Sequence, residues 1–250
     1  MSLVSIIIPV YNITYFREAF NSAYNQSYSE KEIIIIYDNN KKKDFEKICR
    51  ATYKKKNVKL INNNKNLGAG VARNIGIKYS KGTFLAFLDS DDRWVKNKLK
   101  IQIKFMKERK LNFTHTSYNI IDKKNIIIGN HIVKKILTYN NLLNSCDIGL
   151  STVVVKKKII PSNSFPNLRT KEDYVVWLKL AKKNKICGIQ KILSSWRRSQ
   201  NSLSSSFFQK LLDGFRVYYK YENLNLVISI FRVIILSNFY LLKRIKQKSI

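Results

Sequence analysis

The stretch "GTFLAFLDSDD" (residues 82–92) decides the fold, because in it an apolar run leads directly into a group of acids. Residues 84–88 have the length and character of a strand that is buried on both faces, as in a parallel sheet. Three carboxylates follow at once, at Asp89, Asp91 and Asp92. In open α/β sheets ligands bind beyond the carboxyl ends of the strands, so a ligand site is expected here.

Taken alone, this acid cluster has two explanations. Asp and Ser favour turns and helix caps, and a purely structural cluster would need nothing more. The functional explanation is a divalent cation, because Mg²⁺ and Mn²⁺ often take one or two protein carboxylates together with phosphate oxygens of a substrate. A hard cation beside a diphosphate would explain why a chain with a net charge of +31 concentrates acids at this point.

The rest of the first half repeats the pattern of buried strand followed by helix. "VSIIIPV" (residues 4–10), "EIIIIYD" (32–38) and "VKLINN" (58–63) are predicted strands, and segments with helical spacing separate them. This alternation predicts an α/β domain with a mostly parallel sheet. Polar residues follow three of the strands, at residues 11–12, 38–39 and 89–92, and their side chains are expected to meet at one edge.

The second half is less regular. Strands are predicted on both sides of a turn at residues 122–125 and again within residues 145–160. "TKEDYVVWLKLAKKN" (170–184) is a predicted helix, with Thr170 as its N-cap and two acids in its first turn. The apolar segment 224–242, followed by "KRIKQK", suits a membrane-spanning helix, an interfacial helix with a basic anchor, or a terminal helix packed on the core.

Composition limits the class of protein. Apolar residues make up 45% of the 250 residues, which is ordinary for a folded protein, and the three cysteines form no metal or disulfide pattern. The excess of 47 Lys and Arg over 16 Asp and Glu fits nucleic acid, an anionic membrane or a polyanionic substrate. No nucleic-acid-binding motif accompanies it, so no nucleic-acid partner is expected. "MSLVSIIIPVYN" lacks the features of a signal peptide, so a cytoplasmic protein is expected.

Five ordered blocks resemble family 2 glycosyltransferases, which are inverting enzymes of the GT-A fold that use nucleotide sugars. The blocks are "VSIIIPVYN", "EIIIIYDNN", "NLGAGVARNIGIKYSKGTFLAFLDSDD", "KEDYVVWLKL" and "WRRSQNSLS". The resemblance implies a GT-A domain over residues 1–205, with a mostly parallel central sheet and helices on both faces. Residues 1–110 would bind the nucleotide sugar and residues 111–205 the acceptor, while residues 206–250 form a helical tail.

The resemblance also implies which residues bind the donor. Pro9, Tyr11 and Asn12 would line the nucleotide pocket, and Asp38 would accept a hydrogen bond from the base. From the residues alone, the Tyr11 ring suits a core position as well. The family often has two acids at the second strand end, and here Tyr37 stands in place of the first.

Two arginines match family residues near the diphosphate, Arg73 in "GVARN" and Arg197 in "WRRSQNSLS". A guanidinium at a helix start suits a phosphate, and Arg73 equally suits an ion pair with one of the nearby acids. Arg198 is a second basic residue beside Arg197, and Ser199 replaces a histidine that many relatives carry. Asn74 and Gly76 are expected to serve packing. His115 and His131 match no role in the family and are expected to be structural.

The acids complete the implied site. Asp91 matches the metal-binding acid of the DxD motif, and Asp89 and Ser90 would contact the nucleotide sugar, with Asp89 assisting the metal. Asp92 is expected to cap a following helix. Asp173 of "KEDYVVW" matches the general base that an inverting transfer needs. From the residues alone, a first-turn carboxylate that complements the helix dipole explains Asp173 as well.

The resemblance therefore implies a metal-dependent, inverting hexosyltransferase with Mn²⁺ or Mg²⁺ as cofactor. The donor is expected to be a UDP-sugar, and the acceptor a glycan or a lipid-linked saccharide of surface polysaccharide synthesis. The basic surface and the apolar tail add an expected anionic membrane partner, with the protein peripheral on the inner face of the cytoplasmic membrane. Two alternatives stand beside this expectation. One is a catalytically inactive nucleotide-sugar-binding scaffold, which the replacements at Tyr37 and Ser199 leave open. The other, from another class, is a basic nucleic-acid-binding protein, which the net charge suggests and the lack of a binding motif disfavours.

Overall fold

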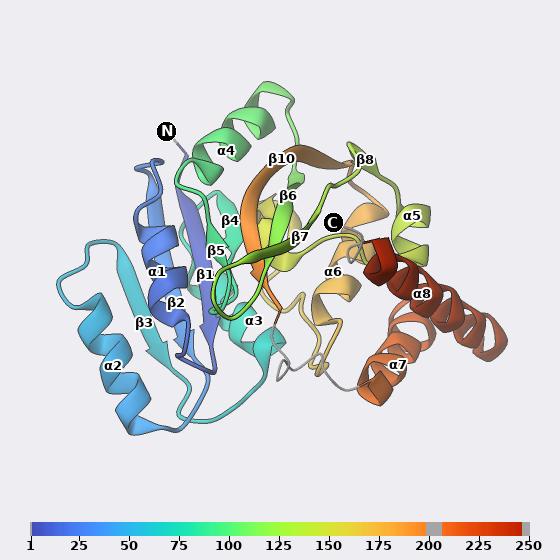
Figure 1. Ribbon diagram of the computed structural model, residues 1–250, viewed down its shortest axis with the longest axis horizontal. Coiled ribbons are helices and arrows are strands. Elements are labelled where there is room, and N and C mark those ends of the chain that lie inside the picture. Colours follow the sequence, from blue (N-terminus) through green and yellow to red (C-terminus); the bar gives the residue numbers. More distant parts are fainter. Residues whose placement is uncertain (1, 199–206, 247–250) are drawn as a thin grey trace.

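The computed structural model describes residues 2–198 and 207–246, which form a twisted central sheet with helices packed around it (Figure 1). Strands and helices alternate along the first half of the chain, as the sequence predicts. In chain order the elements are β1 (Val4–Val10), α1 (Phe16–Tyr24), β2 (Lys31–Tyr37), α2 (Lys42–Thr52), β3 (Val58–Asn62), α3 (Ala69–Tyr79), β4 (Phe84–Phe87), β5 (Arg93–Trp94) and α4 (Lys98–Glu108).

The first-half strands form the parallel part of the sheet, in the order β3-β2-β1-β4. Alternate isoleucines of β1 and β2 point to opposite faces, and both sets are fully or almost fully buried. Ile7, Ile34 and Ile36 pack in one core with α3 and with the later helix that carries Trp177. The other face packs against α1, α2 and α4. Helices on both faces and parallel pairing confirm the predicted fold.

The second half continues the same sheet with strands of both directions. Its elements are β6 (Phe113–Ile121), β7 (Ile127–His131), β8 (Ile136–Leu137), α5 (Tyr139–Asn144), the 3₁₀ helix Leu150–Thr152, β9 (Val154–Lys156), the 3₁₀ helix Lys157–Ile159, α6 (Glu172–Ala181) and β10 (Ile186–Arg197). β9 pairs antiparallel with both β4 and β6, and β10 runs parallel to β6. β6 and β7 form the predicted hairpin around the turn at residues 122–125.

The start of α6 differs from the prediction. Its N-cap is Lys171, in the left-handed conformation with φ 62°, and Thr170 does not cap the helix. The Thr170 hydroxyl and backbone N–H instead both donate to Asp213 Oδ2, each at 2.9 Å. Because Asp213 lies 43 residues further along the chain, the sequence around Thr170 gives no sign of this bond.

The tail is helical and packs onto the rest of the fold. It consists of α7 (Phe207–Arg216), a π-helical segment (Val217–Tyr221) and α8 (Leu226–Lys246), which lie together at the end of the molecule away from α2 (Figure 1). Val217, Tyr218 and Leu236 belong to the same core as Trp177. In the described ranges, 2–198 and 207–246, no helix combines the length and the apolar character that crossing a bilayer requires.

Candidate functional site

The carboxyl ends of β1, β2 and β4 meet at one edge of the sheet. Five of the predicted donor-binding residues follow these ends: Tyr11, Asn12, Asp38, Asp89 and Ser90. Pro9 is buried within β1, two residues beyond Ile7, the last β1 residue that pairs with β4, so its missing N–H removes no bond from that pairing. Tyr11 is 48% exposed, which excludes the core position for its ring. The Ser90 hydroxyl lies 3.4 Å from the Asn12 carbonyl oxygen. The end of β1 therefore adjoins residues 89–92, which we call the acid loop.

Asp38 holds the loop that leads into α3. Its Oδ1 accepts hydrogen bonds from Asn63 Nδ2 and the Leu67 backbone N–H, and its Oδ2 accepts from the Gly68 N–H at 2.8 Å. Only 3% of Asp38 is exposed. Tyr37, at the position where the family often has another acid, is buried and donates its hydroxyl to the Lys41 carbonyl. Asp38 therefore fixes the glycine-bearing loop beside the predicted nucleotide pocket.

Arg73 joins the two halves of the site. Its Nη2 lies 2.8 Å from Asp89 Oδ1 at the end of β4, and its Nη1 donates to Glu172 in the first turn of α6. Only 4% of Arg73 is exposed. Burial lowers the pKa of the guanidinium, but Asp89 and Glu172 outweigh it and leave the pKa raised. The ion pair that was the alternative for Arg73 is thus present, and it has two carboxylate partners.

Close packing around α3 makes this bridge possible. Gly68 precedes the helix with φ 91°, a conformation that side-chain-bearing residues rarely adopt. A Cβ on Gly70 would lie 2.6 Å from the Pro166 carbonyl oxygen, and one on Gly76 would lie 2.4 Å from the Ile7 side chain. Asn74 exchanges two hydrogen bonds with the Phe165 backbone. The packing roles predicted for Asn74 and Gly76 are confirmed.

The acid loop holds two carboxyl groups whose pKa values are raised. Burial and the neighbouring Asp89 raise the pKa of Asp91 to about 6. Burial, Asp91 and Asp89 raise the pKa of Asp92 well above its usual range. Asp92 accepts hydrogen bonds from the Ser151 hydroxyl at 2.6 Å and from the Arg197 backbone N–H at 2.9 Å. Asp91 and Asp89 thus line the partly exposed side of the loop, while Asp92 faces inward.

Asp92 is not a helix cap, which corrects the prediction. The segment after it forms the short strand β5, which pairs with β10, and α4 begins only at Lys98 with Asn97 as its N-cap. Asp92 instead ties the acid loop to β10 and to Ser151, which is 59 residues away in the sequence. The sequence around Asp92 is typical of a helix cap, but the hydrogen bonds with Ser151 and Arg197 determine the conformation of Asp92 instead.

Arg197 anchors the acid loop, the β6–β7 turn and α1 to one another. The guanidinium donates to the backbone carbonyl oxygens of Asp91 and Asp122, both at 2.9 Å. Its Nη2 also donates to the Glu18 carboxylate at 3.0 Å and to the Asn125 side chain at 2.8 Å. The guanidinium carbon lies 3.9 Å from the centre of the Tyr15 ring. With 1% of the residue exposed, Arg197 is committed to protein groups in the structure.

Asp173 lies beside Arg73, Asp89 and Glu172, which we call the Arg73 cluster, and the pKa of the Asp173 carboxyl is raised. Burial and the adjacent Glu172 raise the pKa of the Asp173 carboxyl to about 7, although Arg73 lowers it. Its Oδ1 accepts a hydrogen bond from the Tyr174 backbone N–H at 2.7 Å, as a first-turn carboxylate does. A carboxylate with a pKa near neutrality is suited to accept a proton from a hydroxyl group.

The donor atoms suit a hard divalent cation at Asp89 and Asp91. The raised pKa of Asp91 supports this fit, because burial and the charge of Asp89 both disfavour its ionised form and an added positive charge would offset them. Within the described part of the chain, no group of three or more His, Cys, Asp or Glu residues is arranged to hold a metal. Mg²⁺ commonly takes one or two protein carboxylates and completes its shell with water and substrate phosphates, which is the kind of site that Asp89 and Asp91 could offer.

The sequence did not predict several residues that hold the site together. Ser151, Glu18, Tyr15 and Asn125 hold the acid loop or Arg197, yet none lies within a family block. His115 is fully buried, and burial lowers its pKa to about 3, which agrees with the structural role expected of it. Arg198 donates its backbone N–H to Ile121, and Ser199 lies outside the described residues.

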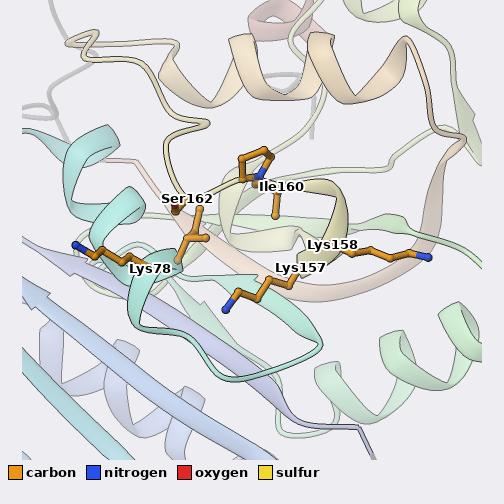
Figure 2. Close-up of a pocket in the computed structure, with 7 residues that line it drawn as sticks. Lys78, Lys157, Lys158, Ile160 and Ser162 are labelled. Atoms are coloured by element: carbon orange, nitrogen blue, oxygen red, sulfur yellow. The ribbon is translucent and has the colours of Figure 1, made fainter.

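A cavity of about 430 Å³ lies beside the last turn of α3, where Ile77 and Lys78 line it, while Arg73 lies in the first half of that helix. Lys78, Lys157 and Lys158 are among its lining residues. Lys157 donates its ammonium group to the Ser80 carbonyl oxygen, and Lys78 and Lys158 extend in opposite directions (Figure 2). The cations do not converge on one point, and the cavity contains none of the predicted donor or catalytic residues.

Comparison with known proteins identifies the family. A family model described as "Glycosyl transferase family 2" matches residues 5–158, more than half of the chain. The chain belongs to glycosyltransferase family 2. It is 39% identical over 214 residues to the Escherichia coli enzyme WfgD, a UDP-Glc:alpha-D-GlcNAc-diphosphoundecaprenol beta-1,3-glucosyltransferase, with 84% of this chain and 82% of WfgD covered. This glycosyltransferase therefore matches its bacterial relative over more than four fifths of both chains.

Solved structures show the same fold at lower sequence identity. Staphylococcus aureus TarS, crystallised with UDP-GlcNAc, superposes with a TM-score of 0.69 at 22% identity, over 91% of this chain and 69% of TarS. The mannosyltransferase PcManGT from Pyrobaculum calidifontis, in complex with GDP-Man and Mn²⁺, gives a TM-score of 0.67 at 13% identity, over 90% and 65% of the two chains. The expected GT-A architecture of this glycosyltransferase is confirmed.

Proposed function

We propose that this glycosyltransferase transfers a hexose from a UDP-sugar to a lipid-linked saccharide, with UDP-glucose as the first donor to test. The 39% identity with WfgD over most of both chains supports a UDP-glucose donor and an acceptor of the GlcNAc-diphosphoundecaprenol type. The product would be an early intermediate of a surface polysaccharide. The observation that carries the proposal is the Arg73 cluster, in which one buried arginine joins Asp89 of the donor half to Glu172 of the acceptor half.

The donor would lie over the carboxyl ends of β1, β2 and β4. Tyr11 presents an exposed ring to the base, and Pro9 and Asn12 would line the same pocket, while Asp38 fixes the loop beside it. Asp89 and Ser90 would face the ribose and diphosphate. A cation held by Asp91 and Asp89, Mn²⁺ or Mg²⁺, would supply positive charge that stabilises the leaving diphosphate.

The arginines would assist in different ways. The Arg73 Nε is buried and has no hydrogen-bond partner among the described residues, so it could donate to a phosphate oxygen only after a shift of the groups that cover it. Arg197 fixes the Asp91 backbone and the β6–β7 turn, so its contribution in this arrangement is to position the acid loop. A direct contact between Arg197 and the diphosphate, as the family resemblance implies, requires some of these bonds to be exchanged.

Inversion at the sugar then takes one displacement. The acceptor hydroxyl oxygen forms a bond to the anomeric carbon while the bond from that carbon to the diphosphate oxygen breaks. The hydroxyl proton moves to Asp173, and the electron pair of the broken bond leaves with UDP. With a pKa of about 7, Asp173 is about half ionised at neutral pH and mostly ionised at slightly alkaline pH, and it is basic enough to take this proton.

The lipid on the acceptor would bring the reaction to a membrane surface. A net charge of +31 favours an anionic surface, and peripheral attachment to the inner face of the cytoplasmic membrane is part of the proposal. The proposal includes no nucleic-acid partner, because the basic residues accompany no recognisable nucleic-acid-binding motif.

The test is transfer from radiolabelled UDP-glucose to a synthetic GlcNAc-diphospholipid, with Mn²⁺ and with excess EDTA. We expect a labelled disaccharide lipid and UDP in equal amounts, with product formation suppressed by EDTA and by Asp91→Asn. Binding of UDP-glucose without transfer to any saccharide acceptor would contradict the proposal and favour the inactive scaffold. Transfer that is unaffected by EDTA would contradict the metal requirement alone.

A further inference from the structure

The side of helix α8 that faces the rest of the protein includes polar residues. Ser229 is fully buried, and Leu236 is 6% exposed. Arg232 donates from Nη1 to Asn144 Oδ1 at 2.7 Å, and the Ser237 hydroxyl donates to the Val233 carbonyl oxygen. The side of the helix that faces the protein is therefore part polar, although a helix on the surface of a water-soluble protein normally buries its apolar side.

The opposite side of α8 is apolar and exposed. Val227, Ile230, Phe231 and Ile234 are 75%, 50%, 61% and 53% exposed, and we call these four residues the α8 outer stripe. They lie three or four positions apart, or adjacent, so they share one side of the helix. A continuous apolar stripe of this kind on a protein surface marks a site of contact with another molecule or with a membrane.

Helix α7 and the π-helical segment add to the same end of the molecule. Phe208, Leu212 and Tyr219 are exposed by 78%, 55% and 51%. Arg216 follows Leu212 by one turn, and 53% of its side chain is exposed. Aromatic, aliphatic and basic side chains together are typical of helices that lie in the interface of a bilayer.

The charges on this part of the chain identify the partner. Residues 207–250 contain eight basic residues and only two acids, Asp213 and Glu222. Both acids are buried and paired, Asp213 with Arg216 at 3.1 Å and Glu222 with Lys182 at 2.7 Å. A second copy of this chain would thus bring one basic surface against another with no free acid to offset the repulsion. An anionic lipid surface is complementary both to the charge and to the apolar stripe.

We propose that α7 and α8 form a docking surface for an anionic lipid bilayer, with the α8 outer stripe inserted among the headgroups. The helix lies along the membrane and does not cross it, in keeping with the absence of any spanning helix among the described residues. Exposed basic residues of the tail, Arg216 and Lys220 among them, bind acidic headgroups. This surface gives the expected membrane association a defined set of residues.

The docking surface is connected to the proposed catalytic base. Asp213 of α7 accepts two hydrogen bonds from Thr170, three residues before Asp173. The side chain of Lys171, the residue after Thr170, also approaches α7: a Cβ added to Gly214 would lie 3.6 Å from Lys171 Cε. A bilayer bound at α7 and α8 would therefore lie on the acceptor side of the protein. This last step rests on the proposed function, because the lipid tail of the acceptor would occupy the same bilayer.

Flotation of the full-length protein with lipid vesicles tests the docking surface without any substrate. We expect the protein to float with vesicles of phosphatidylethanolamine and phosphatidylglycerol, less so as salt rises, and not with phosphatidylcholine alone. The double variant Phe231→Glu/Ile234→Glu should lower the partition coefficient by about tenfold or more, because two apolar contacts are lost and two negative charges are added. Tyr53→Glu is the matched control, since Tyr53 is 70% exposed at the end of α2.

Several results would overturn the proposal: no flotation with anionic vesicles, equal binding to neutral vesicles, or a double variant that floats like the unmodified protein. A dimer that becomes monomeric in the double variant, with vesicle binding unchanged, would assign the stripe to a second copy instead. Val227→Glu, at a 75% exposed position, repeats the test should the double variant unfold. Transfer to a water-soluble acceptor should stay unchanged in every variant, so failure of flotation leaves the proposed transfer standing.

Discussion

Two buried arginines, Arg73 and Arg197, organise opposite sides of the acid loop with different kinds of partner. Arg73 binds two carboxylates, one from each half of the protein, and adjoins a third at Asp173. Arg197 donates to two backbone carbonyl oxygens, one amide oxygen and one carboxylate that is 40% exposed. The first arrangement collects titratable groups, and the second collects mostly groups that never change charge.

This difference separates chemistry from support. A cluster of carboxylates around one guanidinium responds to protons, metal ions and phosphates, because each alters the balance of charge. Backbone carbonyl oxygens offer only fixed partners, so the Arg197 cluster holds three segments of chain at constant distance. We therefore expect substitutions around Arg73 to change catalysis, and substitutions around Arg197 to change mainly stability.

The largest effect is expected from Asp173→Asn. If Asp173 is the base, turnover should fall by about 10²- to 10⁴-fold, the usual contribution of general-base catalysis. Steady-state transfer assays at pH 8 give this number, and binding of UDP in the same preparation controls for an intact donor site. Turnover within threefold of the unmodified enzyme would remove Asp173 from the mechanism.

Arg73→Met should lower both stability and activity. Removing the guanidinium leaves Asp89 and Glu172 without their shared partner, and breaking a buried ion pair in this way costs about 3–5 kcal/mol. Urea unfolding measures the loss, and addition of Glu172→Gln to Arg73→Met should recover part of it. A double variant no more stable than Arg73→Met would mean that Glu172 contributes little to the cluster.

Arg197→Met should lower the free energy of unfolding by about 1–3 kcal/mol, since the carbonyl oxygens of Asp91 and Asp122 lose a charged donor. Turnover of the folded enzyme should fall less than in Arg73→Met, because no carboxylate of the proposed reaction is left unpaired. Urea unfolding and transfer assays on the same preparations make the comparison. Equal losses of turnover in the two variants would erase the distinction between the clusters.

The rate should depend on pH through Asp173. With a folded-state pKa of about 7, kcat/KM should fall tenfold for each unit below pH 7 and level off above it. Stability should change in the opposite sense. Because the folded pKa is raised, the folded protein binds this proton more tightly than the unfolded chain, so the contribution of Asp173 to stability grows as pH falls through 7.

A pH series of transfer rates and urea midpoints therefore distinguishes loss of the base from acid unfolding. Asp173→Asn serves as the control, since its stability should lack this part of the pH dependence. A rate that stays level down to pH 5 would contradict the role of Asp173 as base.

The parallel half of the fold was predictable because it depends on local pattern. Continuous isoleucine runs in β1 and β2 require burial on both faces, and helices must then cover each face. The carboxyl ends of parallel strands lie at the same edge of a sheet. The edge that carries Tyr11, Asp38 and the acid loop was therefore predictable from the parallel direction of the strands alone.

The errors come from contacts between distant parts of the chain. Asp92 and Thr170 both have the side chain of a good cap, yet Asp92 binds Ser151 and Arg197, and Thr170 binds Asp213. The orientation of α8 was equally beyond a local pattern, because both sides of the helix contain apolar residues and only packing decides which side is buried. Tertiary partners overrode propensity at each of these places.

The two hydrogen bonds from Thr170 to Asp213 connect the tail to α6 and bear on whether the enzyme would fold without its tail. A chain cut after residue 205 would leave the Thr170 hydroxyl and N–H without their acceptor, three positions before the proposed base. It would also uncover Tyr174, whose hydroxyl lies 3.0 Å from that of Tyr218. A truncation made to improve handling in water would thus disturb the beginning of α6, and changing exposed residues of α8 while keeping the whole chain is the sounder route.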